Sequence, residues 1–277
     1  MINSWSHSKL TDFDKCKRMF WLKHDQKIPE PPRILKPGQT EFANDRGTRI
    51  HDNCEGYVRG DHDALCPEAD KHFGFQLDLM RVLYAEGLVS LEGEWGMSKD
   101  WEVCGWNGDW MPIHPEAMSA SMKAAAKKSS KYPERGKDGD IIQVGKEYNV
   151  WVPAWLRLKL DAMVMIDKTH AIVIDYKSGR RYGNEVKHAE QLQLYQLVTF
   201  LRYPFLEKVT AELWYIDQNE VTSFTYTRSQ GLRFRDGFNR RGIAALSAIA
   251  FPPASNMHSC KWCPYLNTEH CEDGVSP

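Results

Sequence analysis

Long apolar runs are missing from this sequence of 277 residues, and no segment approaches the roughly 20 residues that a membrane-spanning helix needs. The N-terminal stretch MINSWSHSKLTDFDKCKR has no apolar core of the kind found in signal peptides. An excess of one charge is missing too, because 36 basic residues face 37 acidic ones. We therefore expect a cytoplasmic protein without a membrane partner, whose global charge does not indicate nucleic acid.

A disulfide framework is also not expected, because the seven cysteines are odd in number and cytoplasmic thiols stay reduced. Three of the cysteines cluster near the C-terminus as Cys260, Cys263 and Cys271, with the spacing C-x2-C-x7-C. Clustered thiols in such a protein indicate a metal site, and three thiolates require a fourth ligand.

A chain of 277 residues is long enough for one large domain or two small ones, and its 42% of hydrophobic residues indicates a globular protein. We expect a single domain over residues 1–277 with four parts. These are a helical N-terminal part (1–87), a Trp- and Lys-rich insertion (88–150), an α/β core (151–250) and a Cys-rich tail (251–277).

Apolar periodicity predicts helices over residues 6–24, 42–58, 71–86, 186–203 and 229–250. The strands WLRLKLDAMVMI and AIVIDY are expected to form a β-hairpin over residues 155–176. Two further strands, AELWYID and VTSFTYT, follow the helix that ends before Pro204. Residues 88–115 are expected to form short strands and turns, followed by an inserted helix and loop.

Two segments are locally basic although the whole chain is not. One covers residues 122–137 and the other residues 228–241. Either segment could follow a phosphate backbone, and either could instead be a solvated surface. The basic residues are Lys123, Lys127, Lys128, Lys131, Arg135 and Lys137 in the first segment, and Arg228, Arg233, Arg235, Arg240 and Arg241 in the second.

The residues with the clearest chemical pattern are Asp161, Asp175 and Lys177 in the expected hairpin. Residues two apart on a strand share a face, so Asp175 and Lys177 point the same way. Two carboxylates can bind Mg²⁺ or Mn²⁺ through oxygen, and the metal polarises a phosphoryl group. A lysine beside them can orient or deprotonate water and stabilise the developing charge.

This interpretation depends on the hairpin register. A loop of two residues (168–169) places Asp161 opposite Tyr176, on the wrong face for Asp175. A three-residue loop (168–170) places it opposite Lys177, and a five-residue loop (166–170) places it opposite Asp175. We predict an odd-length loop or a bulge.

Residues before and after the hairpin can complete such a site. His51, in the helical stretch GTRIH, could supply a neutral imidazole as a third metal ligand. Gln191 and Tyr195 lie four residues apart on a helix and so share a face, from which each can bond a phosphate or a base.

Together these segments resemble the RecB-like exonuclease branch of the PD-(D/E)XK nuclease superfamily, including its iron–sulfur members and possible phage-encoded forms. The resemblance rests on SWSHSKLTDFDKCKRMFW, GTRIH, LRLKLDAMVMID, AIVIDYKSGR and QLQLY, in the order of the family. It implies a mixed central β-sheet flanked by helices, and hydrolysis of DNA that is single-stranded or has free ends, in recombination, repair or replication.

The resemblance also implies roles for individual residues. His51, Asp161, Asp175 and the Tyr176 carbonyl match the metal ligands, and Lys177 matches the catalytic lysine. Gln191 and Tyr195 match a motif that supports the site and touches DNA, and we add Arg180 of AIVIDYKSGR to the expected DNA contacts.

Cys16 lies where the family places an N-terminal cysteine, so Cys16, Cys260, Cys263 and Cys271 resemble the ligands of a [4Fe-4S] cluster. Four thiolates suit structural Zn²⁺ equally well on chemistry alone, with His258 or His270 as substitute ligands. Two other functions stay open: a non-catalytic, zinc-containing nucleic-acid-binding protein, and a structure-specific endonuclease with the same site.

Overall fold

The computed structural model describes residues 2–35, 37–126, 133–179, 181–183 and 185–275. The chain divides into two compact units. We call residues 7–93 and 159–277 the core unit, and residues 3–6 and 94–158 the insertion unit. Among the described helices, none is both long and apolar enough to cross a membrane.

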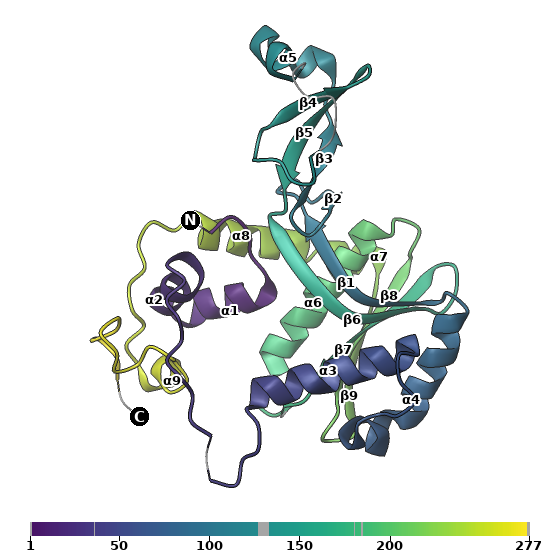
Figure 1. The fold of residues 1–277 in the computed structure, drawn as a ribbon, viewed down its shortest axis with the longest axis vertical. Coiled ribbons are helices and arrows are strands. Elements are labelled where there is room, and N and C mark those ends of the chain that lie inside the picture. The colour runs from purple at the N-terminus through teal and green to yellow at the C-terminus, as the bar shows by residue number, and fades with distance from the viewer. Residues whose placement is uncertain (1, 36, 127–132, 180, 184, 276–277) are drawn as a thin grey trace. The chain divides into compact units, whose positions relative to one another are not determined.

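A mixed six-stranded sheet has the strand order β2-β1-β6-β7-β8-β9 (Figure 1). The expected hairpin forms β6 and β7, which are antiparallel, whereas β7 and β8 are parallel and β8 and β9 are antiparallel. The mixed sheet flanked by helices is thus confirmed. The strands are β1 (Val89–Met97), β2 (Val103–Cys104), β6 (Leu156–Met165), β7 (His170–Lys177), β8 (Lys208–Tyr215) and β9 (Glu220–Thr227).

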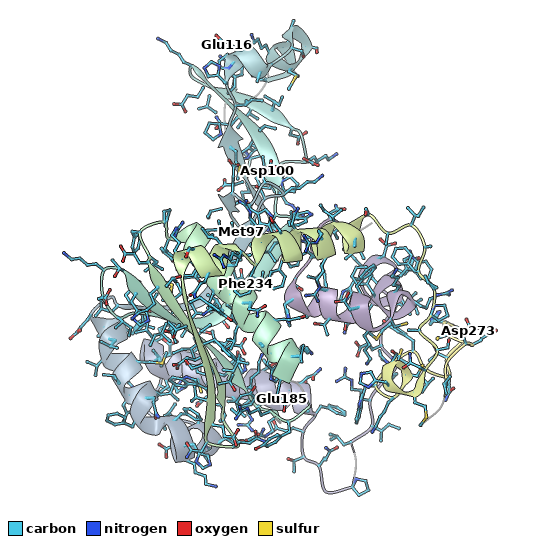
Figure 2. All side chains as sticks on the ribbon, turned by 180° about the vertical axis from the view of Figure 1, so that it is seen from behind. Met97, Asp100, Glu116, Glu185, Phe234 and Asp273 are labelled. Atoms are coloured by element: carbon cyan, nitrogen blue, oxygen red, sulfur yellow. The ribbon has the colours of Figure 1, made fainter. Side chains whose placement is uncertain are left out.

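Helices cover both faces of this sheet in the core unit. On one face, α3 (Ala43–Arg59) and α4 (Pro67–Ala85) pack on alternate residues of β7 and β8, including Tyr176 and Trp214. Phe73 of α4 stacks on Trp214 with the ring centroids 5.0 Å apart. On the other face lies α6 (Glu185–Arg202), whose first residue is labelled in Figure 2. Alternation along the strands therefore sends Asp175 and Lys177 toward α6.

The N-terminal segment differs from the single helix expected over residues 6–24. It forms α1 (His7–Lys15), α2 (Lys17–Phe20) and the π-helical turn η1 (Trp21–Asp25). The break lies at Cys16, whose extended backbone (φ −161°, ψ 114°) stops α1. Its sulfur accepts the Met19 N–H and so caps α2. The thiol therefore replaces the usual oxygen cap.

The Arg-rich segment also forms two helices where one was expected. These are α7 (Arg228–Leu232) and α8 (Arg235–Leu246). Between them, the N–H groups of Arg233 and Phe234 bond carbonyls only three residues back, a tighter geometry than that of the α-helix.

The C-terminal tail, with α9 (Met257–Cys260), is tied to the N-terminal segment by hydrogen bonds. The Ser259 hydroxyl donates to the Lys15 carbonyl at 3.0 Å, and the Tyr265 hydroxyl donates to the Ile28 carbonyl at 2.7 Å. The two ends of the chain therefore share one small apolar cluster around Tyr265.

The insertion unit has a sheet of its own, with the strand order β3-β5-β4. Trp110 and Trp151 pack edge-to-face across β3 and β5 with their centroids 5.4 Å apart. From the sequence we expected a helix and loop in this part, and the strands β4 and β5 were not predicted. The elements of this part are β3 (Gly108–Pro112), η2 (Pro115–Ala117), α5 (Ala120–Ala126), β4 (Ile141–Val144) and β5 (Glu147–Pro153).

The core packing can be tested on α4, which carries a buried and an exposed phenylalanine two residues apart. Phe73 is 1% exposed and Phe75 is 79% exposed. We expect Phe73→Ala to lower the free energy of unfolding by about 3–5 kcal/mol, because it leaves a cavity against Trp214. Phe75→Ala, the matched control, should change it by less than about 0.5 kcal/mol. Urea unfolding in dilute solution measures both, and equal losses would contradict the packing.

Candidate active site

The register of the β6–β7 hairpin brings the two aspartates together. The described pairs run from Met165↔Ala171 to Ala162↔Ile174, so the next position places Asp161 opposite Asp175. Five residues, 166–170, separate the last paired residues, Met165 and Ala171. The predicted odd-length loop is confirmed, and directly opposed residues of an antiparallel pair share a face.

Asp161 lies where the regular ladder between β6 and β7 ends. Its Oδ2 accepts the backbone N–H of Tyr176 at 2.6 Å, taking the place of a ladder carbonyl. The carbonyl of Lys177 accepts the N–H of Ile216 beyond the end of β8. Because successive carbonyls on a strand alternate in direction, the Tyr176 carbonyl lies on the side of β7 that faces β6.

Asp175 is held from the α6 side. Its Oδ1 accepts the Tyr195 hydroxyl at 2.6 Å and the Gln191 amide at 3.2 Å, and that amide also donates to the Tyr195 oxygen at 2.6 Å. The Gln191–Tyr195 pair therefore orients the carboxylate. Tyr195 is only 4% exposed, so its expected contact with DNA does not fit its burial.

Lys177 lies on the same face, as the two-residue spacing predicts. Its Nζ is 2.5 Å from Asp175 Oδ2. That oxygen is buried and, within the described residues, accepts no hydrogen bond beyond this ion pair. The ammonium group and the free lone pairs of the carboxylate therefore face the same small region.

His51 reaches the site from α3. Its Nδ1 is 3.0 Å from Asp161 Oδ1, and its ring lies edge-on to Tyr176. Burial opposes protonation of the ring, but the hydrogen bond and charge of Asp161 outweigh burial and raise the pKa of His51. Burial and the neighbouring charge of Asp175 in turn raise the pKa of Asp161. Both effects show that the site concentrates negative charge away from water.

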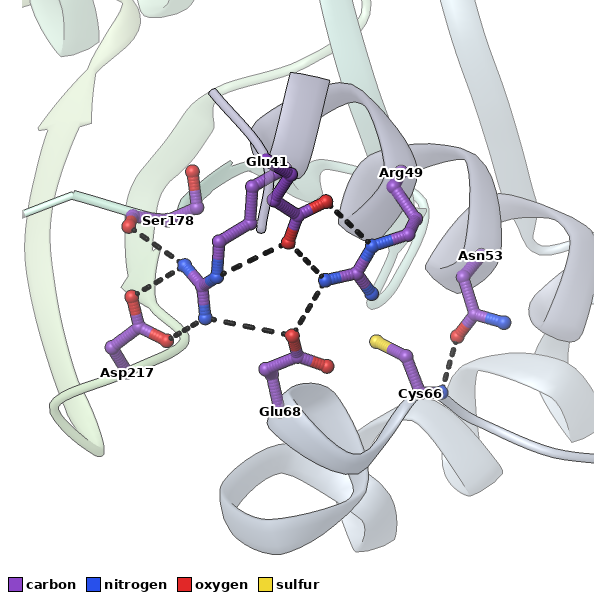
Figure 3. Close-up of polar contacts among 8 residues, drawn as sticks. Glu41, Arg49, Asn53, Cys66, Glu68, Ser178 and Asp217 are labelled. Carbon is purple, nitrogen blue, oxygen red and sulfur yellow. Dashed lines mark hydrogen bonds and ion pairs between the residues drawn. The ribbon is translucent and has the colours of Figure 1, made fainter. Parts of the chain in front are cut away.

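A network of ion pairs holds α3 against the end of β7 (Figure 3). Arg46 of α3 donates to both carboxylate oxygens of Asp217, at 2.9 and 2.7 Å, and to the Ser178 carbonyl at 3.3 Å. Arg49 bonds Glu41 at 2.8 Å and Glu68 at 2.7 Å. Single exposed pairs contribute little, but several charges sharing partners can fix a helix end. His51, half a turn further on, is thereby held beside Asp161.

Gly47 of the GTRIH stretch explains how closely α3 approaches the end of β7. A Cβ at this position would lie 3.1 Å from the Ser178 hydroxyl oxygen. The absence of a side chain therefore lets the helix lie against the residue that follows Lys177.

Two histidines that were not singled out from the sequence lie within the electrostatic influence of Asp175. Burial, followed by the charges of Lys187 and other cations, lowers the pKa of His7 to about 3, and Asp175 is also among the charges that act on it. Burial and the charges of Lys177 and Lys187 lower the pKa of His188 to about 4. Both rings are therefore neutral. Lone histidines without a spacing pattern offer no sequence signal, because their surroundings are set only by the fold.

No three or more His, Cys, Asp and Glu side chains within the described part of the chain converge as a ready metal site. At the candidate site, the contacts described above agree with this. His51 bonds Asp161 directly, so the two groups lie in a chain and do not point at one common centre.

The four expected cysteine ligands line a single pocket between the N-terminal segment and the tail. Cys16 Sγ accepts the Ala254 N–H at 3.4 Å, and Cys260 Sγ accepts the Val275 N–H at 3.5 Å. Burial and then neighbouring cysteines raise the pKa of both Cys263 and Cys271. Cys54, Cys66 and Cys104 lie outside this pocket.

Two arginines of the basic segment 228–241 are engaged within the chain. Arg228 donates to the carbonyls of Phe200, Tyr203 and Leu206 and so closes the end of α6. Arg241 pairs with Asp14 and Glu190. Arg180 and, in the lysine-rich segment, Lys127, Lys128 and Lys131 lie outside the described residues.

Comparisons with solved structures give only distant likeness. The crystal structure of SSO0001 covers 96% of this chain and 98% of its own at 15% identity, with a TM-score of 0.29. A protein of Eubacterium rectale solved under the name "Putative exonuclease" covers 91% of this chain and 84% of its own at 9% identity, with a TM-score of 0.36. No curated protein matches the chain.

The family comparison is more specific. The model of the PD-(D/E)XK nuclease superfamily matches residues 4–268, which is almost the whole chain. The match includes every element that carries the opposed aspartates, the lysine and their supporting residues. The chain therefore belongs to the PD-(D/E)XK nuclease superfamily.

Proposed function

We propose that this protein is a divalent-metal-dependent deoxyribonuclease in which Asp161, Asp175 and Lys177 are catalytic. The proposal rests on the register of the β6–β7 hairpin. Its odd-length loop sets the two carboxylates opposite each other, and the lysine lies on the same face. Membership of the superfamily supports nuclease chemistry. The choice of DNA, and of a RecB-like exonuclease acting on ends or single strands, extends the resemblance found in the sequence.

The residues present fit a hard divalent cation. Asp175 Oδ2 is a buried oxygen whose one described partner is the Lys177 ammonium. Burial, and then the charge of Asp175, raise the pKa of Asp161, as is expected where two carboxylates lie close together. Asp161, Asp175, the Tyr176 carbonyl and His51 would hold Mg²⁺ or Mn²⁺. When bound, such an ion polarises the phosphoryl group and lowers the pKa of a coordinated water. His51 would exchange its hydrogen bond to Asp161 for the ion.

The protein's own groups have distinct tasks in this proposal. Lys177 holds its ammonium beside Asp175, where it can donate to a phosphate oxygen and stabilise charge that develops during hydrolysis. Tyr195 and Gln191 fix Asp175 from behind, and the Tyr176 N–H fixes Asp161. Because these donors belong to a strand and a helix, the carboxylates need little reorganisation when the substrate binds.

The nuclease proposal is tested with end-labelled linear and closed circular single-stranded DNA, incubated with Mg²⁺ or Mn²⁺. We expect metal-dependent digestion of the linear DNA and none of the circle. Asp175→Asn and Lys177→Ala should each slow cleavage by at least about 10²-fold, because each removes a group needed in the transition state.

Asp236→Asn and Lys208→Ala serve as matched controls, since both residues are exposed and outside the site. Cleavage of the circle would instead identify an endonuclease. DNA binding without cleavage of either substrate, under any metal, would overturn the enzymatic proposal and favour a binding protein.

The supporting role of α6 gives a finer prediction. Tyr195→Phe removes the hydroxyl that donates to Asp175 and keeps the buried ring. We expect the Mn²⁺ concentration for half-maximal activity to rise about 10–100-fold, as for other groups that orient metal ligands. Gln191→Ala should act in the same direction. An unchanged metal dependence with a lower maximal rate would show that these residues do not orient the carboxylate.

We also propose that Cys16, Cys260, Cys263 and Cys271 bind a [4Fe-4S] cluster, with structural Zn²⁺ as the alternative. Their common pocket and the N–H groups that point at two of the sulfurs support a thiolate-bound group. The sulfurs would have to converge further than they do here. Such a group would join segments about 250 residues apart and stabilise the fold by restricting the unfolded chain.

The cluster is tested by metal and sulfide analysis of protein purified without oxygen, with absorbance at roughly 400 nm as the optical sign. Cys263→Ser should lose the absorbance and lower the yield of folded protein. Cys104→Ala, outside the pocket, should keep both. One zinc per chain without sulfide would select the alternative, and a folded Cys263→Ser variant of full activity would remove the structural role.

A further inference from the structure

The outer face of α4 carries a stripe of exposed apolar side chains. Phe75 is 79% exposed, Leu79 50% and Val82 57%. The opposite side of the same helix is fully used by the core, through the buried residues Ala69, Phe73, Leu77 and Met80. The stripe is therefore not needed for packing within the chain, and contiguous exposed apolar side chains of this kind commonly mark a contact surface.

Two charged residues continue the stripe at its ends. At about 100° per residue, Lys71, Phe75, Leu79, Val82 and Glu86 fall within an arc of about 80° on the helix surface. Lys71 and Glu86 are both exposed. Among the described residues, neither forms an ion pair, whereas Asp78 beside the stripe accepts the Tyr57 hydroxyl. The stripe is thus positive at one end, apolar in the middle and negative at the other.

The charges of this stripe are complementary to those of a second stripe that runs in the opposite direction. If two copies of α4 lie antiparallel about a two-fold axis near Leu79, Lys71 faces Glu86 of the second copy and Phe75 faces its Val82. A parallel arrangement would instead place lysine against lysine and glutamate against glutamate. Self-complementarity under a two-fold rotation is the condition for a symmetric homodimer.

We propose that the outer face of α4 is a contact surface for a second copy of this chain, paired antiparallel. The segment from Lys71 to Glu86 is only about 22 Å long. One helix against another buries less than the roughly 800 Å² per partner that stable complexes have. The dimer is therefore weak and depends on protein concentration. The proposal is independent of the nuclease function.

The test is sedimentation velocity of the full chain over a concentration series. The wild-type chain should pass from monomer to dimer as its concentration rises, and Leu79→Asp should stay monomeric. Lys71→Glu and Glu86→Lys should each weaken association about tenfold or more, because each creates two like-charge contacts in the dimer. Lys168→Glu, in the exposed β6–β7 turn, is the matched charge control and should dimerise like the wild type.

The decisive experiment mixes the two single charge variants, Lys71→Glu and Glu86→Lys, in equal amounts. In the mixed antiparallel pair, one chain presents glutamate at both ends of the stripe and the other presents lysine at both ends, so both ion pairs are restored. The mixture and the double variant should therefore associate like the wild type. Thermal unfolding checks that each variant folds. A folded wild-type chain that stays monomeric throughout, a Leu79→Asp variant that still dimerises, or a mixture that is not restored would overturn the proposal.

Discussion

The pairing of β6 with β7 is the constraint on which the site depends. Because side chains alternate along a strand, a shift of one residue would send Asp161 to the α3 and α4 face and leave Asp175 without its counterpart. The five residues between the last paired positions, Met165 and Ala171, fix the register that avoids this. Everything else at the site, from the His51 contact to the Tyr195 hydroxyl, is arranged around that pair of positions.

The site also illustrates how a protein keeps two carboxylates close together. Each carboxylate has its own donors: the Tyr176 N–H and His51 for Asp161, and Tyr195, Gln191 and Lys177 for Asp175. These bonds offset part of the repulsion and desolvation that burial imposes. The donors come from different elements, so the arrangement depends on the tertiary fold more than on any single segment.

Much of the fold and of the candidate site could be predicted from the sequence, for physical reasons that differ between residues. Strand alternation placed Lys177 with Asp175, and helical spacing placed Gln191 with Tyr195, because both relations are local. His7 and His188 were not found, since burial beside distant charges leaves no local pattern. The break at Cys16 was missed because a sulfur cap is rare. The strands β4 and β5 were missed although IIQV and EYNVWVP, joined at Gly145, carry the β-branched and aromatic residues typical of a hairpin.

The place of the insertion unit in the chain has a consequence for the order of folding. The hairpin of β6 and β7 closes over five residues, whereas the neighbouring pair β1 and β6 is separated by roughly 60 residues of chain. Loop-closure entropy therefore favours early formation of the hairpin and late addition of β1. The register that opposes the two aspartates is then chosen by a local event, before the long connection has to close.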